Sequence, residues 1–419
     1  MAATRIGAID GVRGLAALSV AIFHCLHLFP VSGSKQALFL KLTELNDLPT
    51  AGARILTGLF NGNAAVSLFF VISGFVLSQS IKRKNLHWPA AIALFAVKRL
   101  VRLYPPMAVC LLVTFGAYLL ASALQPAVHP QPDWNDLVLN LGYVYPALVG
   151  ATYTLFIELG IVPYFAIAVL LTRSFGCKVL VLAIIGSTVL LFTNRIPLGP
   201  WTFSVSQYLF MFLLGALAQY VAGPIRRLSP RSLSLLLVAS YFVLAFARGI
   251  LGYSSRWSLL CEGLSGTAIV ALIAYGRETK PSMWLNRRAI RWMGRLSYSF
   301  YLYHPMVLAI LCPVLLANRT FAVATPALGA LVLVIASVPT ALLLAVYSYR
   351  LVELPTMRVA GWPDLLASIR RDRSQPTAPS VGSVYQISDE EGWDVSTKAS
   401  ASDWRFRLPR LASLRSAAS

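Results

Sequence analysis

IDGVRGLAALSVAIFHC, residues 9–25, joins an apolar run to three ionisable side chains, Asp10, Arg13 and His24. The apolar run extends to Pro30 and is long enough to build most of a helix across a hydrocarbon core of about 30 Å. It has no small-residue cleavage site and follows Asp10 and Arg13, so we expect a retained membrane helix and not a signal peptide.

Similar apolar blocks recur along the whole chain. Of its 419 residues, 57% are apolar and only 12% are charged, which is about half the charged share of ordinary globular domains. This composition argues against a water-soluble protein. It predicts an all-α fold, a polytopic transmembrane helical bundle of about ten helices. The expected spans are 12–30, 63–81, 104–124, 152–172, 178–193, 203–222, 232–250, 257–275, 296–316 and 322–346.

The formal net charge of +20 would suggest nucleic-acid binding in a soluble chain. Here most Lys and Arg residues fall in short loops between apolar blocks, so the positive-inside rule explains them and no nucleic-acid partner is expected. The rule predicts that both termini are cytoplasmic. An interfacial or re-entrant segment at Leu137–Leu148 keeps the number of spans even.

Two parts of the chain differ in composition. Residues 1–358 form the predicted transmembrane domain, whereas residues 359–419 are rich in Ser, Pro, Ala and mixed charge. The second part cannot bury enough apolar surface to fold, so we predict a disordered cytoplasmic tail. The five cysteines show no metal or redox spacing, so no metal site is expected.

Ionisable residues inside membrane spans are costly and therefore functional candidates. Arg13 and His24 lie eleven residues apart, which is roughly three helical turns and a rise of about 16 Å, so they share one helix face. Asp10 lies one turn before Arg13 and can pair with it. The alternative is an ordinary ion pair at a helix start together with a packed, hydrogen-bonded histidine.

A second candidate lies in FAVKRLVRLYPPM, residues 95–107. Arg99 and Arg102 are three residues apart and project from one side of a helix, a spacing suited to gripping two phosphate groups. The positive-inside rule alone would also explain the charge.

Further polar residues occur within predicted spans. Glu158 and Glu262 each need a partner to remain in apolar surroundings. Arg13 and His24 are possible partners for Glu158, and a structural role is the favoured interpretation of Glu262. His304 follows the aromatic run in SYSFYLYHPM, residues 297–306, and precedes a proline.

Together and in this order, these motifs resemble the acyltransferase 3 family of integral membrane acyltransferases. Four motifs carry the resemblance, which runs from Ile9 to about Arg358. They are IDGVRGLAALSVAIFH with Arg13 and His24, SLFFVISGFVL with Ser73, KRLVRLYPP with Arg99 and Arg102, and SYSFYLYHP with His304. The chain departs from the family at Ala65, Val66 and Ser67, and at Tyr153, Thr154 and Leu155, where the family usually has Trp-Ser-Leu.

The resemblance implies a membrane-embedded O-acyltransferase, an acyltransferase that transfers groups other than amino-acyl groups. The acyl group, most simply acetyl, would move from cytoplasmic acyl-CoA to a hydroxyl of an exported or cell-surface glycan. Acyl-CoA would be a co-substrate, with no tightly bound cofactor, and the enzyme would lie in the plasma (inner) membrane.

The resemblance also implies roles for the candidate residues. Arg99, Arg102 and Lys98 would hold the coenzyme A phosphates. Arg13 would orient the donor or a carboxylate, Glu158 would hold His24 in the useful tautomer, and His24 would act as general base. Asp10, His304 and Ser73 are further candidates, and a covalent acyl-histidine intermediate stays open.

Two interpretations from other classes compete with this one. A proton-coupled transporter would use His24, Glu158, Arg13 and Glu262 as a relay, but it gives no reason for the Arg99 and Arg102 pair. A purely structural membrane scaffold predicts that loss of His24 has no effect on any activity.

Overall fold

The structure is a computed structural model that describes residues 2–28, 40–45, 47–82, 88–193, 202–317 and 326–360. The chain divides into two units, residues 1–365 and 366–419, and every described residue belongs to the first. The predicted tail, apart from residues 359 and 360, lies outside the described residues.

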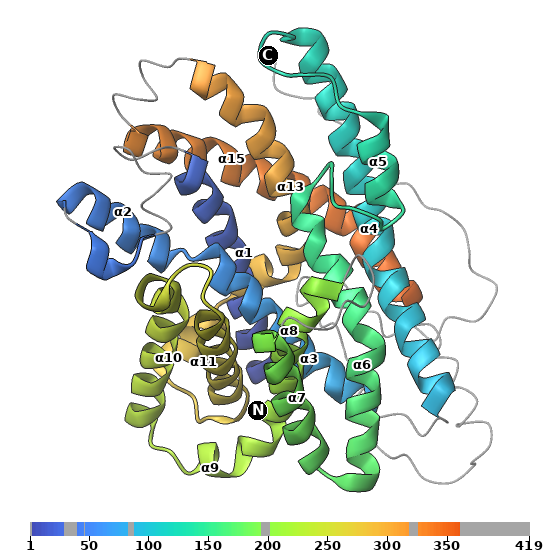
Figure 1. Ribbon diagram of the computed structural model, residues 1–419, viewed down its shortest axis with the longest axis vertical. Coiled ribbons are helices and arrows are strands. Elements are labelled where there is room, and N and C mark those ends of the chain that lie inside the picture. The colour runs from blue at the N-terminus through green and yellow to red at the C-terminus, as the bar shows by residue number, and fades with distance from the viewer. Residues whose placement is uncertain are drawn as a thin grey trace, which may run out of the picture. The chain divides into compact units, whose positions relative to one another are not determined.

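The described residues form a helical bundle without a β-strand (Figure 1). Nine helical segments in this part of the chain are long and apolar enough to cross a membrane. They overlap nine of the ten predicted spans, and the remaining predicted span, 178–193, is the shorter helix α7 (Lys178–Thr193). The principal helices besides α7 are α1 (Ala2–Leu28), α3 (Gly62–Lys82), α4 (Trp88–Leu124), α6 (Tyr153–Phe175), α8 (Thr202–Leu217), α10 (Pro230–Leu251), α11 (Arg256–Tyr275), α13 (Arg288–Ala317) and α15 (Pro326–Ser348).

Shorter elements join these helices. They are η1 (Leu42–Glu44), α2 (Leu48–Leu59), α5 (Trp134–Leu141), η2 (Gly150–Thr152), η3 (Ala218–Val221), α9 (Ala222–Arg226), α12 (Lys280–Leu285) and η4 (Tyr349–Glu353), which is a π-helical turn. Helix α2 was not expected from the sequence. Its Asp47 cap accepts a hydrogen bond from the Thr50 amide at 2.7 Å. Hydrogen bonds from the Thr50 side chain and from this amide hold the pKa of the Asp47 carboxyl below its usual value.

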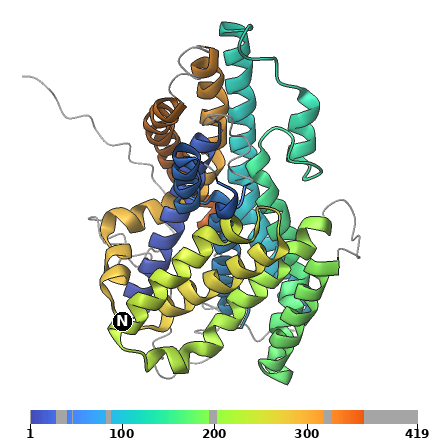
Figure 2. The ribbon, with the colours of Figure 1, turned by 60° about the vertical axis from the view of Figure 1, so that its left-hand side comes forward.

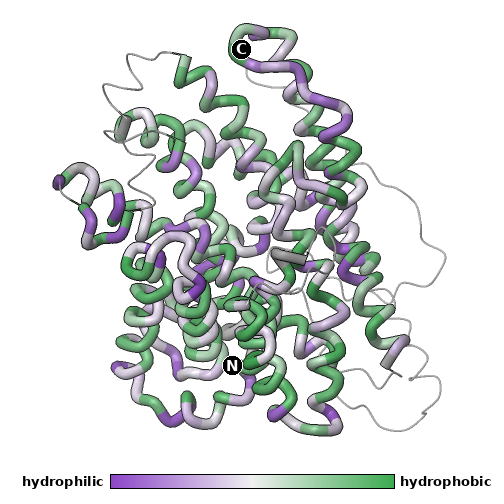
Figure 3. The backbone as a smooth tube through the Cα atoms, in the orientation of Figure 1, coloured by the Kyte–Doolittle hydropathy of each residue, from purple (hydrophilic) through white to green (hydrophobic). Residues whose placement is uncertain are grey.

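Hydropathy follows this architecture, with apolar residues dominating the helices and polar residues gathered mainly at helix ends and connections (Figure 3). Large apolar side chains such as Leu120, Leu182 and Ile335 are exposed on the outside of the bundle. A hydrocarbon surrounding stabilises the exposure of so many large apolar side chains, and water would not.

Several helices begin well before the predicted span. Helix α4 begins at Trp88, not at 104, and α13 begins at Arg288, not at 296. Counting apolar residues detects the uncharged part of such a helix. It misses the preceding part, which belongs to the same helix but carries Lys or Arg residues. Helix α4 also runs through Pro105 and Pro106, as membrane helices can when neighbouring groups satisfy the freed carbonyls.

The segment after α4 turns back along that helix. The Trp134 ring lies 4.3 Å from the Phe115 ring, and the Tyr143 ring lies 5.7 Å from the Tyr104 ring. Phe115 and Tyr104 are eleven residues apart on α4, a rise of about 16 Å. The buried Asn140 side chain closes the non-helical part that follows α5 by accepting from the Val149 amide at 3.0 Å. The segment therefore packs along α4 over about three helical turns.

Helix α1 lies at the centre of the contacts that position the site, where it packs on α3, α13 and α15 (Figures 1 and 2). Gly14 and Gly294 allow α1 and α13 to touch: a Cβ on Gly14 would lie 2.6 Å from the Gly294 amide nitrogen, and a Cβ on Gly294 would lie 2.0 Å from the Asp10 carbonyl oxygen. Only glycine fits so close an approach of two backbones.

Candidate active site

Two histidines, one from α1 and one from α13, meet inside the bundle. His24 lies ten residues after Gly14 on α1, and His304 lies ten residues after Gly294 on α13. Equal separations from one contact mean that the two helices run parallel and in register. The His24 Nδ1 and His304 Nε2 atoms are 3.1 Å apart, and the two rings stack with centroids 5.3 Å apart.

The two rings have different surroundings. His304 is fully enclosed, with 1% of its surface exposed, and its Nδ1 lies 3.3 Å from the Phe300 carbonyl oxygen one turn earlier. His24 is only partly buried. No hydrogen bond to His24 Nε2 occurs among the described residues. Within the described residues, the His304 imidazole is therefore held on both nitrogens and the His24 imidazole on Nδ1 alone.

A cavity of about 110 Å³ lies between α1, α3, α4, α6 and α13. Three arginines line it, Arg13, Arg99 and Arg102, and Glu158 and Ser73 line it as well. A cavity of this size has room for several waters or one small polar group such as a phosphate. Its excess of positive charge suits an anion.

The arginines around this cavity have different partners. Arg99 forms an ion pair with Glu158, and both side chains are largely buried. Arg13 lies 3.9 Å from the Asp10 carboxylate on its own helix. Within the described residues, Arg102 makes no ion pair at all. Arg102 and Arg13 are therefore the cations best able to receive an added anion.

Residues of α13 complete the cavity wall. The Ser297 side chain is buried and its Oγ has no hydrogen-bond partner in the described part of the chain. The Tyr298 hydroxyl donates to the Leu103 carbonyl at 2.7 Å and ties α13 to α4. Tyr301 also lines the cavity, and its ring centroid lies 5.6 Å from that of His304. Tyr301 thus stands between the arginines and the histidine pair.

The structure divides the residues predicted from sequence into two groups. Arg13, Arg99, Arg102, Glu158 and Ser73 line the cavity. His24, His304, Asp10 and Lys98 do not.

One predicted contact is not formed. From the sequence we expected Glu158 to orient His24, but the structure pairs Glu158 with Arg99 on α4 and pairs His24 with His304 on α13. The physical reason is tertiary, because α4 brings a guanidinium next to Glu158 on the facing α6. The sequence names the ionisable residues of each span but not which spans face one another.

Glu353 lies just past the last predicted span, and the sequence alone indicated no role for it. Its carboxylate accepts a hydrogen bond from Ser299 at 2.6 Å, it is 3% exposed, and it lies within electrostatic reach of Arg102. It is the last residue of the π-helical turn η4, and such turns occur often at functional sites. A carboxylate just after an apolar span was the available sequence signal.

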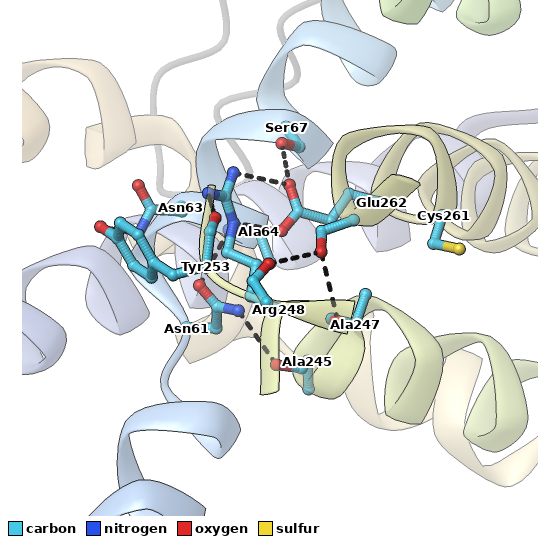
Figure 4. A network of polar contacts seen from close by, with 12 residues as sticks. Asn61, Asn63, Ala64, Ser67, Ala245, Ala247, Arg248, Tyr253, Cys261 and Glu262 are labelled. Atoms are coloured by element: carbon cyan, nitrogen blue, oxygen red, sulfur yellow. Dashed lines mark hydrogen bonds and ion pairs between the residues drawn. The ribbon is translucent and has the colours of Figure 1, made fainter. Parts of the chain in front are cut away.

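Glu262 belongs to a separate network (Figure 4). Arg248 donates to its two carboxylate oxygens at 2.6 and 3.2 Å, and Ser67 donates to Oε2 at 2.6 Å. Arg248 also donates to the Tyr253 carbonyl at 2.8 Å. The network ties α3, α10 and α11 together and lines no part of the cavity. These contacts favour the structural interpretation of Glu262.

Groups that could bind a metal do not gather in the described residues: no three His, Cys, Asp or Glu side chains lie together there as a metal site would need.

Fold and site together define a multi-pass integral membrane protein whose helices enclose an arginine-lined cavity beside a histidine pair. The family model described as an acyltransferase domain matches residues 6–346, most of the chain. The protein therefore belongs to the acyltransferase 3 family and is a membrane protein of the acyltransferase class. Comparison with curated proteins and with solved structures gave no match.

Proposed function

We propose that this protein is a membrane O-acyltransferase. It takes an acyl group, most simply acetyl, from cytoplasmic acyl-CoA and transfers it to a hydroxyl of an exported or cell-surface glycan, from the plasma (inner) membrane. The observation that carries the proposal is the arginine-lined cavity next to the His24 and His304 pair, in a chain of an acyltransferase family.

The cavity supports a donor-binding role. Phosphate groups of coenzyme A bind guanidinium groups through charge-assisted hydrogen bonds, and Arg102 with Arg13 supplies such groups. Arg99 lines the same cavity but is neutralised by Glu158, so it adds shape more than net charge. A proton-coupled transporter has no need of a cavity of this charge.

Donor binding requires a local rearrangement. The cavity has room for about one phosphate group. Tyr301 lines it, and the Tyr301 ring centroid lies 5.6 Å from that of His304. The acyl end of the donor reaches His24 only when the side chain of Tyr301 moves aside. Tyr301 therefore separates the phosphate-binding end of the site from the end where acyl transfer takes place.

The reaction needs one base near neutral pH. His24 Nε2 takes the proton of the acceptor hydroxyl while the hydroxyl oxygen attacks the thioester carbonyl carbon. The carbon–sulfur bond then breaks, and the leaving thiolate takes the proton from His24. The products are an O-acyl ester and free coenzyme A thiol, and His24 returns to its neutral form.

The experiment is transfer of labelled acetyl from acetyl-CoA in membranes that contain the full-length chain, with identification of the labelled product. His24→Ala should insert normally and lower turnover by roughly 10²- to 10⁴-fold, the usual contribution of a general base. His27→Ala, a change to the neighbouring and more exposed histidine, is the control. Normal turnover in His24→Ala would contradict the mechanism.

A further inference from the structure

The orientation of the His24–His304 hydrogen bond has a chemical consequence. Each neutral imidazole has one nitrogen that donates and one that accepts, so the 3.1 Å contact between His24 Nδ1 and His304 Nε2 admits two directions. The direction decides which nitrogen of His24 carries a lone pair.

The Phe300 carbonyl determines the direction. It lies 3.3 Å from His304 Nδ1, and a carbonyl oxygen only accepts. His304 Nδ1 must therefore carry the proton, which leaves His304 Nε2 as the acceptor. His24 Nδ1 must then be the donor. In the opposite arrangement, the lone pair of His304 Nδ1 would face a lone pair of the Phe300 carbonyl oxygen beside the buried His304 ring.

We infer that His304 is a positioning residue that holds His24 protonated on Nδ1 and so keeps the His24 Nε2 lone pair available as the base. This inference deepens the proposed function and rests on it for the use of that lone pair. His24 Nε2 makes no hydrogen bond among the described residues, in agreement with a nitrogen kept free for substrate.

His304 also supports the reaction as it proceeds. When His24 Nε2 takes the acceptor proton, the ring becomes a cation and its Nδ1–H donates to His304 from a charged group. Charge-assisted hydrogen bonds are stronger than neutral ones. His304 does this without becoming charged, and its own proton remains on Nδ1, hydrogen-bonded to the Phe300 carbonyl oxygen.

Burial makes the arrangement rigid. His304 is 1% exposed and its ring contacts those of Phe300 and Tyr301. No water competes for either nitrogen in such a position. The close contact of Gly14 with Gly294 sets the distance between the helices, so the backbone holds the two imidazoles in register.

The test is the tautomer of His24 in the full-length resting protein in lipid bilayers. Solid-state NMR of ¹⁵N,¹³C-histidine-labelled protein distinguishes Nδ1–H from Nε2–H imidazoles, and His24→Phe identifies the His24 signals. We expect Nδ1–H in the wild type. His304→Gln retains an acceptor oxygen and should keep Nδ1–H, whereas His304→Leu has no acceptor and should shift His24 toward Nε2–H.

Kinetics provide the second measurement. His304→Leu should lower turnover by about 10²-fold with an unchanged donor KM, because it weakens the base and not the phosphate contacts. His304→Gln should recover most of the loss. An Nε2–H tautomer of His24 in the wild type, or unchanged turnover in His304→Leu, would overturn the inference.

The two proposals fail in different ways. The tautomer is measured without any acyl transfer, so an Nε2–H result refutes the positioning role even in an active enzyme. If the wild type shows the Nδ1–H tautomer but His24→Ala still transfers acetyl at the normal rate, His24 is not the general base of the proposed function.

Discussion

Arg99 and Arg102 look equivalent in the sequence but differ in their surroundings. Arg99 is committed to Glu158, whereas Arg102 lines the same cavity without a carboxylate partner in the described part of the chain. Arg102→Ala should therefore weaken donor binding by about ten- to hundredfold, the usual value of a hydrogen bond to a charged group. Binding of desulfo-coenzyme A measures it. Arg231→Ala, which removes an exposed arginine outside the cavity, should leave binding unchanged.

Arg99→Ala should act mainly on stability. It leaves the largely buried Glu158 carboxylate unpaired, at a cost of roughly 3–5 kcal/mol. Thermal unfolding in detergent measures the loss, and Arg99→Met combined with Glu158→Gln should recover part of it. If Arg99→Ala keeps its stability and loses donor binding as Arg102→Ala does, the division of roles between the two arginines is wrong.

Among the ionisable residues, Glu262 has the clearest structural role, because it forms a buried ion pair with Arg248. Removing it by Glu262→Ala strands the Arg248 guanidinium in a buried position and should destabilise the protein by about 3–5 kcal/mol. Replacing both residues, as Arg248→Met with Glu262→Leu, should cost much less. Glu278→Ala removes an exposed carboxylate and is the matched control. Donor binding in the folded fraction of Glu262→Ala should be unchanged, because the network lies outside the cavity.

Helices α1 and α13 carry the two histidines, and their close contact holds the two rings together. Gly294→Ala would place a methyl group 2.0 Å from the Asp10 carbonyl oxygen. The helices must then separate, at a cost of about 1–3 kcal/mol for overpacking, and the contact between His24 and His304 should lengthen. We expect turnover to fall further than stability alone would explain, measured by transfer assays on protein that remains folded.

Gly116→Ala is the matched control for that prediction. Gly116 lies inside α4, and nothing lies within 4 Å of an added Cβ there. The change should be neutral or stabilise by about 0.5–1 kcal/mol, because alanine favours a helix interior. Equal effects of Gly294→Ala and Gly116→Ala would mean that close approach of α1 and α13 is unimportant.

At this scale, the sequence predicted the helices well because apolar run length is a strong local signal. It missed α2 and the early start of α4, because the amphipathic and basic parts of a helix do not stand out from a loop by hydropathy alone. It singled out Arg13, His24, Arg99, Arg102 and Glu158 as candidates because charge inside an apolar block is conspicuous. It could not pair them, because pairing depends on which helices face one another.

At the scale of the whole molecule, the proposed function requires acyl-CoA on the cytoplasmic side of the membrane and the glycan acceptor on the other side. The positive-inside rule predicts a cytoplasmic amino terminus. With that orientation, Arg13 and Arg102 lie nearer the cytoplasmic surface and His24 lies nearer the middle of the membrane. Inside-out vesicles should therefore use added acetyl-CoA, and sealed right-side-out vesicles should not. Labelled product from both kinds of sealed vesicle would contradict the predicted orientation.

The sequence by itself determined that this protein is a membrane-embedded helical bundle of the acyltransferase 3 family, because hydrophobic length and ordered motifs are local properties of the chain. Only the tertiary structure decided that Glu158 faces Arg99 and that His304 faces His24. These pairings depend on contacts between helices far apart in the chain, such as that of Gly14 with Gly294. No local sequence pattern encodes how closely two such helices approach each other.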